Sequence, residues 1–492
     1  MKNFKLVLFV ALASLFVACD DAIDITQPSE LTPEAAYETV EDLQLGLNGV
    51  YSSIPGESQI LFTSLFTDEV KIGRANGGQG TGGELGFLLN TNSGDAASIW
   101  VSNYSLINSA NRLIFGAAKV VPTTEEEIEE YNSILGQAYA LRAFGHLQLL
   151  SYFTTNMADD SALGVPLVDF VPTTDQQLSR NTNGEVFALI ESDLKFAEDN
   201  IANSLVGGLY VANTGVTTNV VNAIRARMYV YREKYDVAEP YVNALSSIAL
   251  ATKGPINATN RGTYVNMFLD QGVGEVIWKL QRTTTGGGTG NFYQFWSSVN
   301  STVNGSPFYE VSTALFNLVN NSTDIRRDVI VDPSAAPSYT VRPVGKYSIT
   351  ENINLLADVK VFRASEIRFL KAEILASRND LAGVATQVNS VRRARNNLTL
   401  TGNVGILPAP TTVKEAWAMI LQERRVELAF EGHRYIDLRR LGAKADVSVN
   451  RSASDCAFNE ACELPIDDYR WTLPIPRSEQ AANPGIQQNP GY

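Results

Sequence analysis

Residues that could carry out catalysis are few in this chain of 492 residues. Its two histidines, His146 and His433, lie far apart within helical patterns, where a histidine is more often packed than catalytic. No G-x-S-x-G, H-E-x-x-H or P-loop motif occurs. The adjacent acids Asp68 and Glu69 could serve a glycosidase only if two carboxylates flanked one bond about 5 to 10 Å apart. Acidic pairs are common on solvated loops, so the sequence favours a protein that is not an enzyme and has no cofactor or metal site.

A dense set of charges occupies residues 421–441, LQERRVELAFEGHRYIDLRRL. Apolar residues recur there at helical spacing and Gly432 interrupts them, so we expect one helix to end near Phe430 and another to start after Gly432. Pairs of opposite charge three residues apart are expected along these helices: Arg424/Glu427, Glu431/Arg434 and Asp437/Arg440. We interpret the stretch as a structural charge network and not as a reaction centre.

The composition is that of a globular protein, with 45% hydrophobic and 19% charged residues. This is enough apolar sequence to bury a large core. The formal net charge is −14, with no long block of one sign, which argues against a nucleic-acid partner and against attraction for polyanions. The negative net charge favours a neutral ligand.

The first residues, MKNFKLVLFVALASLFVAC, have the pattern of a secretory signal. Lys2 and Lys5 precede an apolar stretch that is too short for a confident membrane span. Cleavage before Cys19 and lipidation of its thiol would give a bacterial lipoprotein with a polar tether over residues 19–33. The alternative is an ordinary signal followed by a coincidental cysteine. Removing residues 1–18 takes away two lysines and no acids, which changes the net charge from −14 to −16.

The other two cysteines, Cys456 and Cys462, do not have the C-x-x-C spacing of a metal knuckle. In an exported protein they can close a small disulfide loop. We favour this disulfide over two free thiols in a surface loop.

Helices must position most of these groups. Thr124-x-x-Glu127 and Thr182-x-x-Glu185 are capping boxes, and Thr32 with Pro33 opens an earlier helix. Apolar spacing predicts helices over residues 34–51, 96–117, 124–152, 182–201, 219–233, 235–245, 364–377 and 384–395. Helix pairs with small residues at contact positions predict a mainly α, tetratricopeptide-like scaffold, although the strict repeat signature is absent.

The middle of the chain is less regular. Residues 275–282 alternate as a strand, and residues 339–348 and 358–362 are weaker strand candidates. Residues 73–86 are glycine-rich and predict an exposed loop. Another loop, rich in glycine and serine, contains NFYQFW at residues 291–296. Four tryptophans fall in apolar or scaffold patterns and are expected in the core: Trp100, Trp278, Trp417 and Trp471.

Several segments resemble, in order, those of SusD-like (RagB-type) surface lipoproteins of the Bacteroidota. The motif ERRVELAFEGHRYIDLRR is similar to the C-terminal signature of that family. The other matching segments are Leu141-Arg142-Ala143, Gly164-Val165-Pro166, Ala372-Glu373, residues 388–395 and the closing Asn489-Pro490-Gly491-Tyr492.

The resemblance implies a single SusD-like domain over residues 34–492. Its helical scaffold would span about 34–260 and 363–492, with a variable, loop-rich binding region at about 261–362. It also implies a lipid-anchored protein on the outer face of the outer membrane, where Asp20, Asp21 and Asp24 resemble the family's export signal. There it would act in nutrient uptake as a lid on a SusC-like TonB-dependent transporter and capture polysaccharide or oligosaccharide.

A glycan platform needs exposed aromatic faces with polar groups at their edges. Phe292, Tyr293 and Trp296 are the first candidates, although the stretch could instead form a short helix that buries Phe292, Phe295 and Trp296. The resemblance adds polar contacts from an early loop, here Asp68, Arg74 and Asn76, which could also be ordinary surface.

The net charge favours a neutral glycan, such as a β-glucan, over alginate or pectin. The alternatives are a peptide-binding lid of the same architecture and, third, a surface glycosidase.

Overall fold

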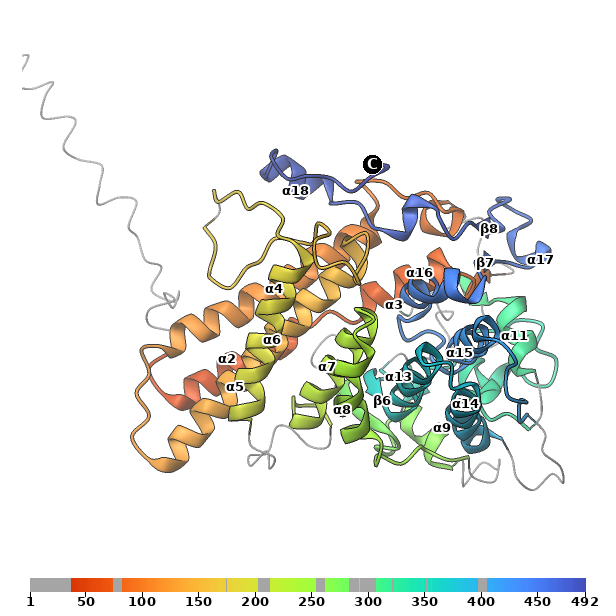
Figure 1. The fold of residues 1–492 in the computed structure, drawn as a ribbon, viewed down its shortest axis with the longest axis horizontal. Helices are drawn as coiled ribbons and strands as arrows, with labels where there is room; N and C mark the ends of the chain where they lie inside the picture. The colour runs from red at the N-terminus through yellow and green to blue at the C-terminus, as the bar shows by residue number, and fades with distance from the viewer. Residues whose placement is uncertain are drawn as a thin grey trace, which may run out of the picture.

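The computed structural model describes residues 37–73, 82–173, 175–201, 213–253, 262–282, 292, 307–320, 323–347, 349–350, 353–354, 356–396 and 405–492. Within these ranges the fold is mainly α-helical, as predicted, with short two-stranded sheets. The helices within residues 40–52 and 94–200 lie together on one side of the molecule, those within 364–445 lie on the other, and those within 218–245 lie between them (Figure 1).

The first half of the chain consists of long helices. They are α2 (Val40–Ser52), α3 (Glu57–Phe66), α4 (Gly94–Ala117), α5 (Glu125–Phe153), α6 (Asn183–Asn200), α7 (Thr218–Tyr231) and α8 (Tyr235–Leu245), with a 3-10 turn, η2 (Gly83–Gly86). The capping boxes predicted at Thr124 and Thr182 are both present. Helix α2 begins later than predicted, because Thr39 and Asp42 form its capping box.

The second half has shorter helices around a few strands. Its helices are α9 (Gly262–Phe268), α11 (Thr313–Val319), α12 (Arg327–Ile330), η3 (Pro333–Ala335), α13 (Ala364–Ser377), α14 (Leu381–Arg395), α15 (Val413–Glu427), α16 (Arg434–Ala445), α17 (Ala453–Cys456), η4 (Tyr469–Trp471) and α18 (Arg477–Ala482). After α16 the chain returns across the N-terminal helices, where Trp100 Nε1 donates a hydrogen bond to Glu479 at 3.2 Å (Figure 1).

The described strands form two-stranded antiparallel sheets. They are β1 (Val70–Ile72) with β3 (Tyr309–Val311), β2 (Val276–Leu280) with β6 (Val359–Arg363), β4 (Ile349–Thr350) with β5 (Ile353–Asn354), and β7 (Val449–Asn450) with β8 (Glu463–Leu464). The strands predicted at 275–282 and 358–362 therefore pair with each other. The weak candidate at 339–348 is wrong, since those of its residues that are described form turns and one isolated bridge at Val344.

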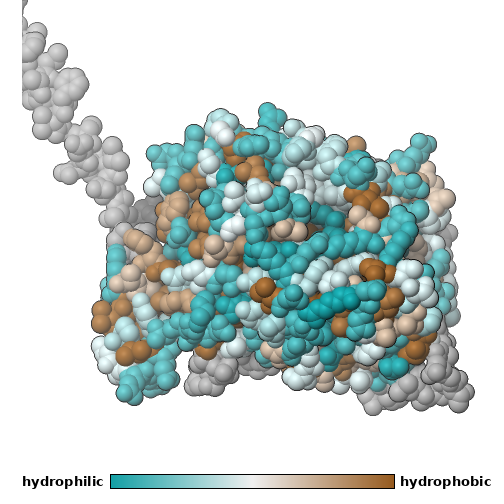
Figure 2. Space-filling view, in the orientation of Figure 1, coloured by the Kyte–Doolittle hydropathy of each residue, from teal (hydrophilic) through white to brown (hydrophobic). Residues whose placement is uncertain are grey.

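One large hydrophobic core joins the two halves. It includes Leu47 of α2, Trp278 of β2 and Leu441 of α16. All four tryptophans assigned to the core are buried, which confirms that prediction. On the outside, the face drawn in Figure 2 is mostly hydrophilic, with hydrophobic residues in small separate areas, as is usual for a surface in water.

Helix α3 was not predicted. Every residue from Gln59 to Phe66 is buried, so the helix has no polar face and shows no amphipathic periodicity in sequence. In the described ranges we find no helix with both the length and the apolar character needed to cross a membrane.

Candidate functional site

Strands β1 and β3 bring the ends of the two predicted binding loops together. Val70 pairs with Val311, and beyond the last pair Gly73 N donates to Phe308 O at 2.8 Å. A Cβ atom at Gly73 would lie 1.8 Å from the carbonyl oxygen of Pro307, so only glycine allows this approach. The glycine-rich stretch therefore starts beside the residue at which the long loop containing NFYQFW ends.

Phe292 does not have the exposed position that we predicted. Its ring is 2% exposed and stacks on Tyr347 with the ring centroids 4.4 Å apart. Tyr347 in turn donates a hydrogen bond from its hydroxyl to Phe430 O at 2.9 Å. A phenyl ring has no polar atom to keep solvated, so burial stabilises it here. We correct Phe292 from a glycan contact to a core residue. Tyr293, Trp296, Arg74, Asn76 and the lipidation site Cys19 lie outside the described residues and remain predictions.

Asp68 is also corrected. It is 1% exposed, and Arg434 binds both its oxygens, Nε to Oδ1 at 2.8 Å and Nη2 to Oδ2 at 2.9 Å. Arg425 Nη2 lies 3.1 Å from Oδ2. Burial by itself would raise the pKa of Asp68, but the charges of Arg425 and Arg434 outweigh burial and lower the pKa to about 2. The carboxylate is thus occupied by arginines and is not available to a sugar hydroxyl.

The neighbouring Glu69 has the opposite character. It accepts hydrogen bonds from Phe430 N at 3.0 Å and from Ser64 Oγ at 2.8 Å. Burial raises its pKa to about 7, despite these hydrogen bonds. Two adjacent acids therefore differ in charge near neutral pH, because Arg425 and Arg434 form their ion pairs with Asp68 and not with Glu69.

The rest of the 421–441 stretch is a buried charge network, as predicted. Glu427 lies 2.9 Å from Arg363 Nη1 and 2.8 Å from Arg395 Nη2. Both arginines also bind Glu275. Burial opposes ionisation of Glu427, but Arg395 and Arg363 outweigh it and hold its pKa well below the usual range. These contacts join α14 and α15 to β6 and to Glu275, the residue before β2.

Two of the three predicted pairs within the stretch are wrong. Asp437 and Arg440 do approach, at 3.4 Å. Arg424 instead pairs with Asp437 at 2.8 Å. Glu431 pairs with Arg363 at 2.7 Å, and Arg434 pairs with Asp68. Helices α15 and α16 are packed on several sides. Acids and bases from other segments therefore pair with their charged side chains in place of the neighbours three residues away.

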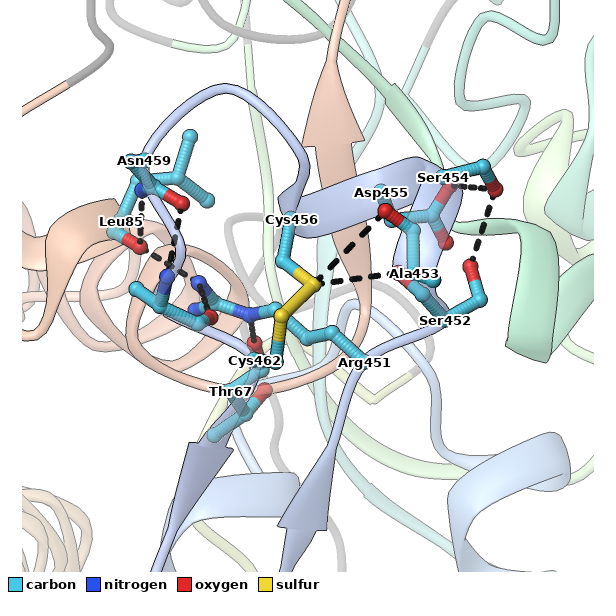
Figure 3. The surroundings of a disulfide bond; sticks show 11 residues. Thr67, Leu85, Arg451, Ser452, Ala453, Ser454, Asp455, Cys456, Asn459 and Cys462 are labelled. Carbon is cyan, nitrogen blue, oxygen red and sulfur yellow. Dashed lines mark hydrogen bonds between the residues drawn. A yellow bond between two sulfur atoms is a disulfide. The ribbon is translucent and has the colours of Figure 1, made fainter.

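The disulfide between Cys456 and Cys462 is present, which confirms its prediction, with the two Cα atoms 5.2 Å apart. Figure 3 shows Arg451 beside it, donating to the carbonyl oxygen of Thr67 at 2.8 Å and also to that of Leu85. Arg451 also reaches Ala461 O, inside the disulfide loop, at 3.1 Å. Arg451 therefore links the disulfide loop to the segment before the glycine-rich stretch and to the end of that stretch.

Neither histidine is placed for proton transfer with solvent. His146 accepts at Nε2 from Val168 N at 3.3 Å, so its Nδ1 donates to Arg142 O at 3.0 Å. Burial lowers the pKa of His146 to about 4. Burial and surrounding cations, Arg227 first among them, lower the pKa of His433 well below its usual value. Across the described part of the chain, no group of three His, Cys, Asp or Glu side chains is arranged to hold a metal ion.

Sequence comparison identifies the family. The model of the SusD family matches residues 333–492, and the model described as "Starch-binding associating with outer membrane" matches residues 20–230. SusD-like protein P2 of Formosa agariphila is 24% identical over the whole of both chains. SusD-like protein P38 of the same organism is 24% identical, over 91% of this chain and 93% of its own.

Solved structures share the fold. A putative sugar binding protein from Bacteroides vulgatus superimposes with a TM-score of 0.71 at 24% identity, covering 93% of this chain and 100% of its own. A SusD superfamily protein from Bacteroides thetaiotaomicron gives a TM-score of 0.72 at 20% identity, covering 92% and 100%. The chain belongs to the SusD-like proteins, a family associated with the outer membrane.

Proposed function

We propose that this SusD-like protein is a cell-surface lipoprotein that captures a polysaccharide or oligosaccharide and delivers it to a SusC-like TonB-dependent transporter. The observation that carries the proposal is the pairing of Gly73 with Phe308. This hydrogen bond places Gly73 beside Phe308. The stretch with Arg74 and Asn76 begins after Gly73 in sequence, and the loop with Tyr293 and Trp296 ends before Phe308. Aromatic faces next to amide and guanidinium groups are the chemistry that sugar rings require.

The ligand class follows from charge. The chain has a net charge of −14, which disfavours acidic glycans such as alginate or pectin. We therefore propose a neutral glycan, with a β-glucan as the first candidate. Two solved relatives in fold are themselves described as a sugar binding protein and a carbohydrate binding protein, which supports a saccharide over a peptide.

The binding experiment uses the chain from residue 20, which lacks the signal and Cys19, and a neutral β-glucan, with affinity measured by titration calorimetry. We expect Trp296→Ala to weaken binding about five- to tenfold, because one stacked aromatic contributes roughly 1 kcal/mol. Phe115→Ala is the matched control, since Phe115 is an exposed aromatic (64%) on α4, outside the loops. Equal affinity of Trp296→Ala and wild type would remove the aromatic loop from the site.

The alternative of a peptide-binding lid predicts a different result in the same assay. Oligopeptides would then bind, and gels containing polysaccharide would not retard the protein. Release of reducing ends from a bound glycan would instead support the glycosidase.

Anchoring is tested separately. If Cys19 carries lipid, Cys19→Ser should move the protein from the membrane fraction to the soluble fraction, and external protease should reach the wild-type protein on intact cells. Soluble wild-type protein would contradict the anchor.

A further inference from the structure

A recess lined by both polar and apolar side chains lies where the two halves of the fold meet. It has a volume of about 60 Å³ and is lined by α3, α5, α7, β6 and the turn between α15 and α16. A second recess, of about 100 Å³, adjoins it, since the two share Ser151, Tyr231 and Ile436. The first recess is bounded by Gly432, whose φ of +82° lets the turn pass close to α3.

Gln59 of α3 contributes an unusual side chain to this recess. The residue is only 4% exposed. Neither its amide nitrogen nor its amide oxygen has a hydrogen-bond partner among the described residues. A buried amide left in this way costs free energy, so a partner from outside the chain is expected.

The charged groups around the recess are already neutralised within the protein. Arg227 binds Glu366 at 2.7 Å, Lys360 binds Asp270 at 2.7 Å and Glu431 binds Arg363 at 2.7 Å. A bound carboxylate or cation would therefore find no unpaired counter-ion among the described residues that line the recess.

The occupant must therefore be neutral and able to donate and accept at once, which a hydroxyl group can do. Phe144, Tyr152 and Tyr231 also line the recess, and aromatic side chains suit the apolar part of a sugar. Since one water needs about 10–15 Å³, the recess has room for roughly four to six waters. That room fits part of one sugar ring and not a polysaccharide chain.

We propose that this recess is a subsite for the hydroxyl-bearing edge of a neutral sugar, held by the amide of Gln59. The subsite is distinct from the loop residues proposed above and does not depend on them. A sugar bound there would contact the N-terminal helices and the α15–α16 turn at once, and so would stabilise the folded chain.

The test measures the melting temperature of the mature protein against glucose concentration, with glycerol as a second arm. We expect a saturable rise for wild type, on the order of 2 °C when glucose is about ten times its Kd. Sugars also stabilise proteins as excluded osmolytes, but that rise in melting temperature does not saturate and is equal in all variants. Gln59→Leu should abolish the saturable part of the glucose-dependent rise in melting temperature and keep the part that does not saturate. A saturable rise with glycerol alone would assign the subsite to small polyols and overturn the sugar.

Gln137→Leu is the matched control, because Gln137 is also a buried glutamine but accepts its hydrogen bond from Tyr51. Its glucose shift should equal that of wild type. If Gln59→Leu does not fold, Gln148→Leu removes another amide that lines the recess. Equal glucose shifts in wild type and the recess variant would mean that only water occupies the recess. A saturable rise of the melting temperature with acetamide but not with glucose would assign an amide ligand. Either result overturns the proposal.

Discussion

Arg434 binds both carboxylate oxygens of Asp68, a residue 366 positions earlier in the chain. The two N–H groups lie 2.8 and 2.9 Å from Oδ1 and Oδ2, which is the geometry of a two-pronged guanidinium–carboxylate pair. The pair fastens the start of α16 to the residues that follow α3. Neither group is exposed enough for water to replace its partner.

Removing Arg434 should therefore cost much stability. We expect Arg434→Ala to lower the free energy of unfolding by about 3–5 kcal/mol, because it leaves a buried carboxylate short of a partner. Arg434→Lys should lose less, since the charge remains but the planar fork does not. Urea unfolding measures both. Lys414→Ala, which breaks an exposed pair with Asp446, is the control and should lose far less stability, because water screens that pair.

Arg425→Ala tests whether this network is structural only. Asp68 would keep Arg434, so we expect a loss of about 1–3 kcal/mol in stability. Glycan affinity of the folded variant should equal that of wild type. Selective loss of affinity would show that the network contributes to binding.

Glu69 predicts a pH dependence of stability. Its folded pKa of about 7 lies above the ordinary value of 4.5, so its favourable contribution is complete below pH 4.5 and is lost as pH rises to 7. Glu69→Gln removes this titration. The stability of the variant relative to wild type should rise by about 2–3 kcal/mol between pH 4.5 and 7.5. A difference that is independent of pH would contradict the raised pKa.

The backbone conformation of Gly432 should make substitutions there destabilising. Its φ is +82°, and a Cβ atom added there would lie 3.6 Å from its nearest neighbour, so space is not limiting. Gly432→Ala should cost about 1–2 kcal/mol through conformation alone, and Gly432→Asn should cost less. Gly49 is the control: it lies inside α2 with nothing within 4 Å of a Cβ. Gly49→Ala should stabilise the protein by up to about 1 kcal/mol. Equal effects at both glycines would refute this explanation.

The disulfide predicts a modest, local stabilisation. It joins residues six positions apart, and a loop this short gives about 2 kcal/mol in the chain-entropy estimate. The double variant Cys456→Ser, Cys462→Ser should lose this amount in urea unfolding, and wild type with reductant should lose the same. Hydrogen exchange should quicken at Arg451 N, which donates to Cys462 O. If reductant destabilises the double variant as much as wild type, the effect does not come from this bond.

Local signals predicted the scaffold well. The capping boxes at Thr124 and Thr182 start α5 and α6 where expected, because a cap depends on residues three positions apart. Helix α3 was missed because burial on all sides removes the alternation between polar and apolar faces on which such predictions depend.

The site was harder to predict, because its contacts join distant parts of the chain. Asp68 looked like a surface acid, and its partner Arg434 is not near it in sequence. One signal was available: residues 421–441 contain five arginines but four acids, so at least one guanidinium needed a partner from elsewhere. Phe292 belongs to an aromatic-rich segment for which the sequence left both exposure and burial open, and no local pattern indicates Tyr347 as its stacking partner.

The long separation between Asp68 and Arg434 has a consequence for how the chain is made. A ribosome or an export channel releases the N-terminal helices first, and at that stage the acid at residue 68 has neither of its arginines. Burying it alone would cost several kcal/mol, so the first half should stay loosely folded until α15 and α16 emerge. We expect the nascent chain to remain pliable enough for translocation, and to close its core only when its last part has arrived.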